Sequence, residues 1–116
     1  TIEEVKNIIT AYYNHITDQK ILTGFSFQGN AVWLSTENQF NYKTAYDLAI
    51  QTNGATLPVT FKFGTDDNPV FHKFSNMEEF TEFYTALALF VQQTLQEGWD
   101  KKFNINWSAY EAVHND

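Results

Sequence analysis

The longest periodic stretch of the chain runs from Ser75 to Asn104 and predicts one long amphipathic helix. Its apolar residues recur at steps of three or four, which gathers them on one face of an α-helix. That face consists of Met77, Phe80, Phe83, Tyr84, Leu87, Ala88, Phe90, Val91, Leu95, Trp99 and Phe103. A helix this apolar needs cover, so we expect the rest of the chain to pack against it.

The sequence also predicts where this helix begins and whether it continues through its glycine. Ser75 and Glu78 have the spacing of a capping box, so we expect Ser75 to be the N-cap. Gly98 would cost about 1 kcal/mol relative to alanine inside a helix. The four-residue rhythm of apolar side chains nevertheless continues across Gly98, and we predict that the helix passes through it.

The first segment predicts another helix. Thr1 and Glu4 form a second capping pattern, and apolar residues then recur with helical spacing, which indicates a helix from Thr1 to about residue 18.

Between residues 22 and 35 the period changes to two, which predicts a β-hairpin. We take Gly29-Asn30 as its two-residue turn, with glycine in the first position. One face of the hairpin is then apolar and consists of Phe25, Phe27, Val32 and Leu34. The opposite face consists of Ser26, Gln28, Ala31 and Trp33.

A second helix should begin after Ser35 or Thr36 and end at Asn53-Gly54. We expect it to be more exposed than the others, because its apolar stripe is narrow. That stripe consists of Tyr42, Ala45, Tyr46, Ala49 and Ile50.

The alternation in residues 57–64 and the apolar segment 70–74, separated by a polar turn, predict a second hairpin. Which face of its returning strand is buried stays open, because the apolar Phe71 lies on one face while Val70 and Phe74 lie on the other. A short last helix is expected after Asn106 or Ser108.

These elements predict an α+β fold in the order helix-hairpin-helix-hairpin-helix. Two antiparallel β-hairpins form a small sheet, packed against a long C-terminal helix and two further helices. At 116 residues, we expect one domain that spans 1–116.

The charge balance narrows the class of partner. The net charge is −7, and all seven basic residues are lysines. Arginine is the preferred group for phosphate and base recognition, so we expect no nucleic-acid partner and no anionic membrane partner. The longest apolar run, Ala86–Val91, is far shorter than the ~20 residues of a membrane span, and we expect an acidic, soluble protein.

Candidate catalytic residues are few. His72 with Glu78 or Asp66 offers the residue types of an acid–base pair, which would suit a small hydrolase. Carboxylates in the first turn of a helix are more typical of capping and dipole partners. The sequence carries none of the common nucleophile, phosphate-loop or dinucleotide motifs. We therefore expect no enzyme activity and no cofactor.

Metal ligands are also scattered. The turn 66–68 could offer oxygens to Ca²⁺, but six to eight ligands are normal, which favours a solvated turn. His15, His72 and His114 have no zinc-site spacing, and the chain contains no cysteine. We expect no metal site.

Trp33 is the aromatic residue that the hairpin core explains least. Beside Ser26 and Gln28 it would suit sugar stacking or a protein interface. The alternative is a hairpin covered on both faces, in which Trp33 belongs to the core.

The order GFSFQGNAVWLSTENQFN, LPVTFKFG and SNMEEFTEFYTALALFVQQTLQEGWDKKFNIN resembles a domain-of-unknown-function family of phage and prophage proteins, often encoded near or within tail-fibre regions. The resemblance covers most of the chain after about residue 20 and includes Val32-Trp33-Leu34 and the Lys101-Lys102 region. The role of the family is unknown, so the resemblance implies no functional residues.

The resemblance implies a non-catalytic structural or protein-interaction module of a phage- or prophage-derived, tail-associated protein. Its partner would be another protein or a second copy of the chain. It would reside in the bacterial cytoplasm during expression or in the phage virion. A carbohydrate-binding module that uses exposed aromatics such as Trp33 is the alternative, and a small hydrolase is the second alternative.

Overall fold

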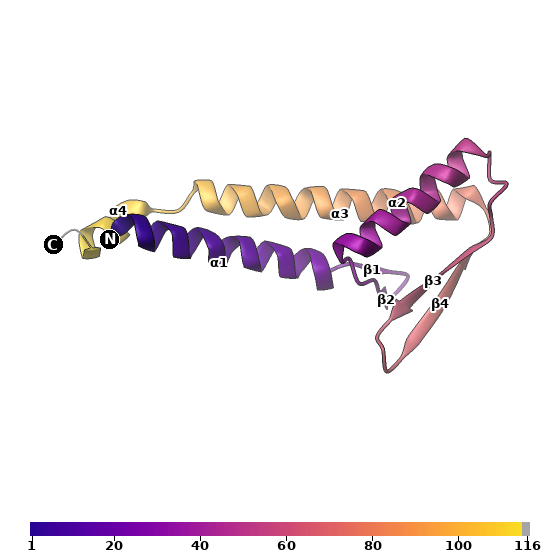
Figure 1. Ribbon diagram of the computed structural model, residues 1–116, viewed down its shortest axis with the longest axis horizontal. Helices are drawn as coiled ribbons and strands as arrows, with labels where there is room; N and C mark the ends of the chain where they lie inside the picture. Colours follow the sequence, from indigo (N-terminus) through magenta and orange to yellow (C-terminus); the bar gives the residue numbers. More distant parts are fainter. Residues whose placement is uncertain (115–116) are drawn as a thin grey trace.

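Two long helices, α1 (Ile2–Thr23) and α3 (Met77–Phe103), run antiparallel and form a stem (Figure 1). At one end of the stem, α2 (Thr36–Gln51) and two β-hairpins form a head. At the other end α4 (Trp107–His114) lies beside the N-terminus. This computed structural model describes residues 1–114, and the molecule measures 66 × 33 × 20 Å.

The N-terminal caps explain where the long helices begin. Thr1 forms the predicted capping box, in which the Glu4 amide donates to the Thr1 hydroxyl at 3.3 Å. The predicted N-cap of α3 is wrong by one residue, since the Glu79 amide donates to the Asn76 side chain at 2.9 Å. The ladder of the second hairpin still includes Phe74, and the cap therefore falls one position later than Ser75.

The predicted length is accurate for α3 but too short for α1. α3 passes through Gly98 as predicted. α1 continues beyond the predicted end near residue 18, as far as Thr23, where the Gly24 amide donates to the Lys20 carbonyl. The extra turn places Ile21 in the core, which a period-based reading of the first eighteen residues does not include.

The first hairpin consists of β1 (Ser26–Phe27) and β2 (Asn30–Ala31). The predicted turn is wrong: Phe27 pairs with Asn30, so Gln28 and Gly29 form the turn. Both have positive φ, 50° and 81°, as a type I′ turn requires. A shift of two residues leaves every side chain on its predicted face. The apolar face is buried as predicted and consists of Phe25, Phe27, Val32 and Leu34.

The second hairpin consists of β3 (Val59–Gly64) and β4 (Pro69–Phe74). Val59 pairs with Phe74, and Phe74 is fully buried whereas Phe71 is 67% exposed. This settles the facing of the returning strand. The two hairpins form two separate two-stranded sheets within the predicted α+β fold and element order.

The core lies in the head and is built largely from aromatic rings. Phe80 and Phe83 of α3 are fully buried against the hairpins and α2. Tyr46 of α2 stacks on Tyr84 of α3 with ring centroids 4.6 Å apart. The stripe predicted on α2 is narrower than expected, because Ile50 is half exposed while its neighbour Ala49 is fully buried.

Outside the head, the only helix packed along α3 within residues 1–114 is α1. One helix covers one side of another, so part of the predicted apolar face of α3 stays uncovered. Phe103 shows this most clearly, since the structure leaves it 87% exposed although its spacing places it on the predicted core face. The hairpins therefore cover only the N-terminal half of α3 (Figure 1).

Candidate functional site

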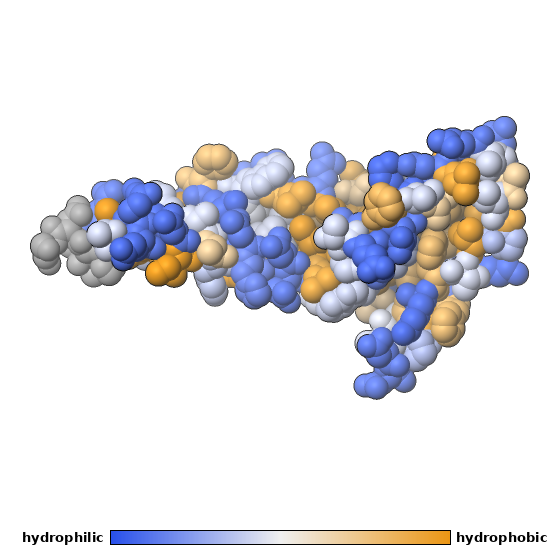
Figure 2. All heavy atoms as spheres, in the orientation of Figure 1, coloured by the Kyte–Doolittle hydropathy of each residue, from blue (hydrophilic) through white to orange (hydrophobic). Residues whose placement is uncertain are grey.

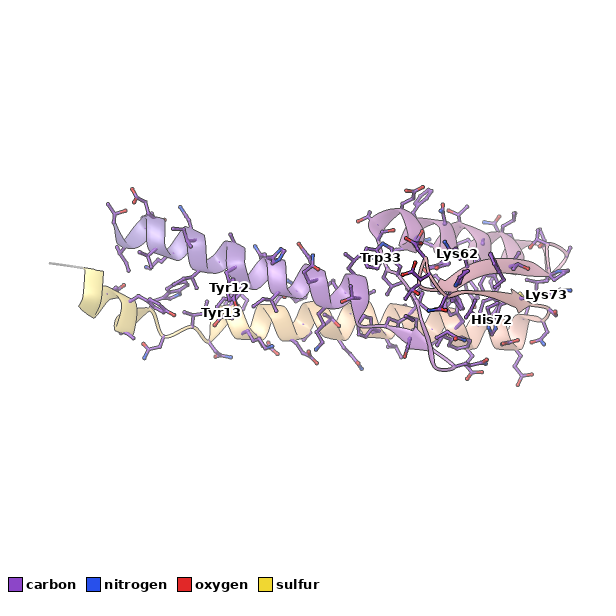
Figure 3. All side chains as sticks on the ribbon, turned by 90° about the horizontal axis from the view of Figure 1, so that it is seen from below. Tyr12, Tyr13, Trp33, Lys62, His72 and Lys73 are labelled. Carbon is purple, nitrogen blue, oxygen red and sulfur yellow. The ribbon has the colours of Figure 1, made fainter. Side chains whose placement is uncertain are left out.

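A groove of about 750 Å³ opens in the head between β3, the first half of α2 and the segment that follows β2. Consecutive residues 31–33 line one side, and consecutive residues 61–66 line another. Side chains of neighbouring strand residues point to opposite faces, so lining by consecutive residues means that the groove runs along the edge of β3. Figure 3 shows Trp33 and Lys62 on the same side of the head.

Trp33 is 53% exposed, which decides between the two alternatives for this residue. Its neighbours Val32 and Leu34 are buried, and alternation then turns Trp33 outward. The backbone is held on both sides, because the Leu34 amide donates to the Leu22 carbonyl at 3.0 Å and the Asn38 side chain donates to the Trp33 carbonyl at 2.8 Å. The exposed indole is therefore presented from a fixed backbone.

The apolar floor of the groove comes from Tyr42, Phe61 and Phe63. Tyr42 meets Phe61 edge to face with ring centroids 4.8 Å apart, and its burial raises the pKa of the hydroxyl group. At the rim, Lys62 Nζ lies 3.1 Å from Asp66 Oδ1. Water screens this ion pair, because the Asp66 side chain is fully exposed.

The other two predicted binding residues lie elsewhere. Ser26 is exposed on β1 opposite Ala31 and does not line the groove. Gln28 lies in the hairpin turn, where its side-chain nitrogen is 3.5 Å from Glu79 Oε1. The structure therefore brings Trp33 together with Lys62 and not with Ser26 or Gln28.

The carboxylate next to His72 is neither Glu78 nor Asp66, the two that we considered as its partners from the sequence. Its Nε2 lies 2.7 Å from Glu79 Oε1, and its ring packs 4.5 Å from that of Phe74. Asp66 is engaged by Lys62 instead. Through Gln28 and His72, the Glu79 carboxylate ties the first hairpin and β4 to the first turn of α3.

The residues proposed as oxygen ligands, Asp66 to Asn68, form the tight turn between β3 and β4. The Asn68 amide donates to the Thr65 hydroxyl there at 3.1 Å. Among the side chains that the structure describes, no three His, Asp or Glu residues converge as a metal ion would require. The helices described are also too short or too polar to cross a membrane.

A second feature lies on the stem, where apolar side chains face solvent. On α1, Ile8, Tyr12 and Ile16 follow one another four residues apart and are 69%, 61% and 38% exposed. We call them the α1 row. On α3, Trp99 and Phe103 have the same spacing and are 47% and 87% exposed. We call them the α3 pair. Figure 2 shows apolar patches along the stem as well as over the head.

Contacts between the helices place these surfaces on opposite flanks of the stem. Lys20 Nζ lies 2.6 Å from Glu97 Oε2 on one flank, and Lys102 donates to Asn14 Oδ1 at 2.7 Å on the other. Lys20 continues the spacing of the α1 row, so that row lies on the Glu97 flank. Gly98 faces Thr17 of α1, and Glu97 and Trp99 lie about 100° to either side of it, so the α3 pair lies on the flank away from Glu97.

One family model matches residues 4–116, namely Domain of unknown function (DUF4376). The chain belongs to this family. Comparisons with curated proteins and with solved structures find no match. Membership confirms the predicted domain-of-unknown-function family.

For this member of the DUF4376 family, the sequence anticipated only part of the candidate site. Asn38, Asn41 and Lys62 line the groove with Trp33, although none was singled out from the sequence. They come from α2 and β3, and no spacing along the chain indicates that these elements meet. The uncovered α1 row carried a signal, since its four-residue spacing is readable before the structure is known.

Proposed function

We propose that this chain is a non-catalytic interaction module of a phage- or prophage-derived, tail-associated protein, and that its stem associates with a second copy. The observation that carries the proposal is the α1 row, with Tyr12 61% and Ile8 69% exposed. Burying one such side chain contributes about 1.5–3 kcal/mol. A row of this kind on an otherwise regular helix is typical of a helix-packing surface.

The distribution of charge favours a second copy as the occupant. Residues 2–23 of α1 and 88–103 of α3 carry four lysines and five carboxylates. This part of the stem is therefore nearly neutral, whereas residues 24–87, which comprise the head and the first part of α3, carry seven carboxylates and three lysines. Two stems can approach without strong repulsion, whereas two heads would repel each other.

The surroundings of His72 support a non-catalytic role. His72 is held between core rings and Glu79, and it does not line the groove. A general acid or base needs to reach a bound substrate, and this histidine instead joins β4 to α3.

Light scattering across a concentration series tests the stem. We expect a mass above one chain that falls toward the monomer in Tyr12→Glu, because a buried unpaired carboxylate is strongly unfavourable. Asn7→Glu is the matched control, since it adds the same charge at an exposed position of α1. A wild-type chain that stays monomeric at every concentration, or a control that dissociates equally, would contradict the proposal.

The tail association needs a separate test, which is the set of genes beside this one. Neighbouring tail-structure genes would support it. A neighbourhood of unrelated metabolic genes would count against it and would leave the stem experiment untouched.

A further inference from the structure

The outer edge of β3 is unpaired where it borders the groove. Thr65 and Asn68 exchange two backbone hydrogen bonds of 3.2 Å across the turn. Hydrogen-bonded and non-hydrogen-bonded pairs alternate along an antiparallel ladder, so the Gly64–Pro69 and Lys62–Phe71 pairs are of the second kind. The N–H and C=O groups of Lys62 therefore point away from β4, whereas Gly64, whose φ is +81°, bends the backbone toward the turn.

Both of these residues line the groove. Among residues 1–114, neither has a backbone hydrogen-bond partner beyond the strand ladder. In the extended part of β3, outward donors and acceptors repeat every second residue, at Thr60 and Lys62. This is the arrangement that another extended backbone complements.

Two elements supply the rest of the groove lining. Asn38, Asn41 and Tyr42 come from the first half of α2, while residues 31–33 come from β2 and the segment after it, which approaches β3. A free strand edge beside an apolar floor is the geometry in which domains bind peptides by strand addition. A glycan would leave the repeated backbone groups of the edge only partly matched.

Charge indicates the kind of segment that fits. The Asp66 carboxylate stands fully exposed at the rim, while Lys62 is its ion-pair partner. Residues 24–87, which comprise the head and the first part of α3, carry seven carboxylates against three lysines. Basic side chains in the bound segment would be attracted to this part of the molecule.

We propose that an extended polypeptide segment of a partner protein binds here as a third strand beside β3. Its backbone pairs with the outward groups of Lys62 and passes beside Gly64. Its apolar side chains pack against Trp33 and Tyr42, and a basic side chain lies near Asp66. The site is separate from the stem, so this proposal does not depend on self-association.

The probe is a pool of N-acetylated hexapeptides with apolar residues at alternate positions and lysine between them. It is titrated into the ¹⁵N-labelled chain and followed by NMR. We expect the amides of Lys62 and Gly64 and the Trp33 indole to shift. A peptide N-methylated at the pairing positions should bind about tenfold more weakly or worse, because it loses backbone hydrogen bonds.

Two variants separate strand addition from other binding. Lys62→Pro removes an outward N–H, a position where an edge strand tolerates proline, and should weaken binding about tenfold. Trp33→Ala changes an exposed side chain and leaves the strand edge intact, so it should weaken binding while the Lys62 amide still shifts.

Several outcomes would overturn the proposal. They are the absence of shifts at Lys62 and Gly64 at millimolar peptide, equal binding of the N-methylated peptide, and shifts confined to the stem. A glycan panel that moves the Trp33 signal where the peptides do not would identify a carbohydrate site instead. Repeating the titration in Tyr12→Glu keeps the result separate from the fate of the stem.

Discussion

Gly98 of α3 lies directly against Thr17 of α1. A Cβ at residue 98 would overlap the Thr17 hydroxyl oxygen and would lie 3.1 Å from its Cγ2. Thr94, one turn earlier, is also buried. Small or short side chains on this face let the two stem helices approach closely, which explains why a helix-weakening residue occupies the middle of α3.

Gly98→Ala should therefore destabilise the chain, although alanine is the better helix former. Overpacking of a tight contact costs about 1–3 kcal/mol, because the branched Thr17 side chain has little freedom to move aside. Urea unfolding followed by circular dichroism measures the change. The double variant Gly98→Ala/Thr17→Ala should recover stability relative to Gly98→Ala alone. If Gly98→Ala instead gains about 1 kcal/mol, the helix propensity alone would govern this position.

The turn of the first hairpin offers a stabilising change. Gln28 adopts a φ of +50°, which asparagine tolerates better, and Asn-Gly is the preferred pair for this turn. Gln28→Asn should raise the free energy of unfolding by a few tenths of a kcal/mol, because the 3.5 Å contact with Glu79 that it gives up is exposed.

Asn30→Gln is the control for that change, since Asn30 is a strand residue in the observed register. It should have less effect than a substitution of Gly29, whose φ is +81°. A large loss at Asn30, together with tolerance at Gln28→Val, would instead favour Gly29-Asn30 as the turn.

Two phenylalanines of β4 should respond in opposite ways to truncation. Phe74 is fully buried, so Phe74→Ala should cost about 3–5 kcal/mol. Phe71 is mostly exposed, and Phe71→Ala should change stability by no more than about 0.5 kcal/mol. Thermal unfolding of the two variants at equal concentration compares them directly, and a reversed order would place the strand in the other facing.

The ion pair between Lys20 and Glu97 predicts a pH dependence in the stem. The hydrogen bond from Lys20, followed by its positive charge, lowers the pKa of the Glu97 carboxyl. A lowered folded-state pKa contributes stability above the pKa of the unfolded chain, and this is lost as pH falls through the folded-state value. The contribution is small because both side chains are about half exposed.

Carbon NMR of the side-chain carboxyl groups checks this prediction. The Glu97 carboxyl should titrate below its ordinary range in the wild type, and Lys20→Gln should raise its pKa toward the ordinary value. Lys43→Gln is the control, since Lys43 pairs with Asp47 on α2 and has no contact with Glu97. An unchanged pKa of Glu97 in Lys20→Gln would show that the pair does not persist in solution.

The candidate site was predictable only where one element defines it. Trp33 stood out because the alternation around Val32 and Leu34 placed it on the face opposite the hairpin core. Lys62 and Asn38 gave no such signal, because their meeting with Trp33 depends on how β3 and α2 pack. The carboxylate partner of His72 could not be predicted from the sequence either, because Glu79 lies beside it only where β4 and α3 cross.

By itself, the sequence determined the kind and order of the elements and the buried face of the first hairpin. These follow from interactions between residues close along the chain, namely hydrophobic periods of 2 and 3.6 and the Thr1 capping box. The sequence did not determine the register of the first hairpin, because a shift of two residues leaves every side chain on the same face.

Only the tertiary structure decided that α1 and α3 pair at Thr17 and Gly98, that Trp33 faces solvent, and that the α1 row and Phe103 stay uncovered. A hydrophobic pattern states which surfaces need cover. Which surfaces pack together depends on residues far apart in the chain. The two helices of the stem bury only the faces that they turn toward each other, so their remaining apolar side chains stay exposed.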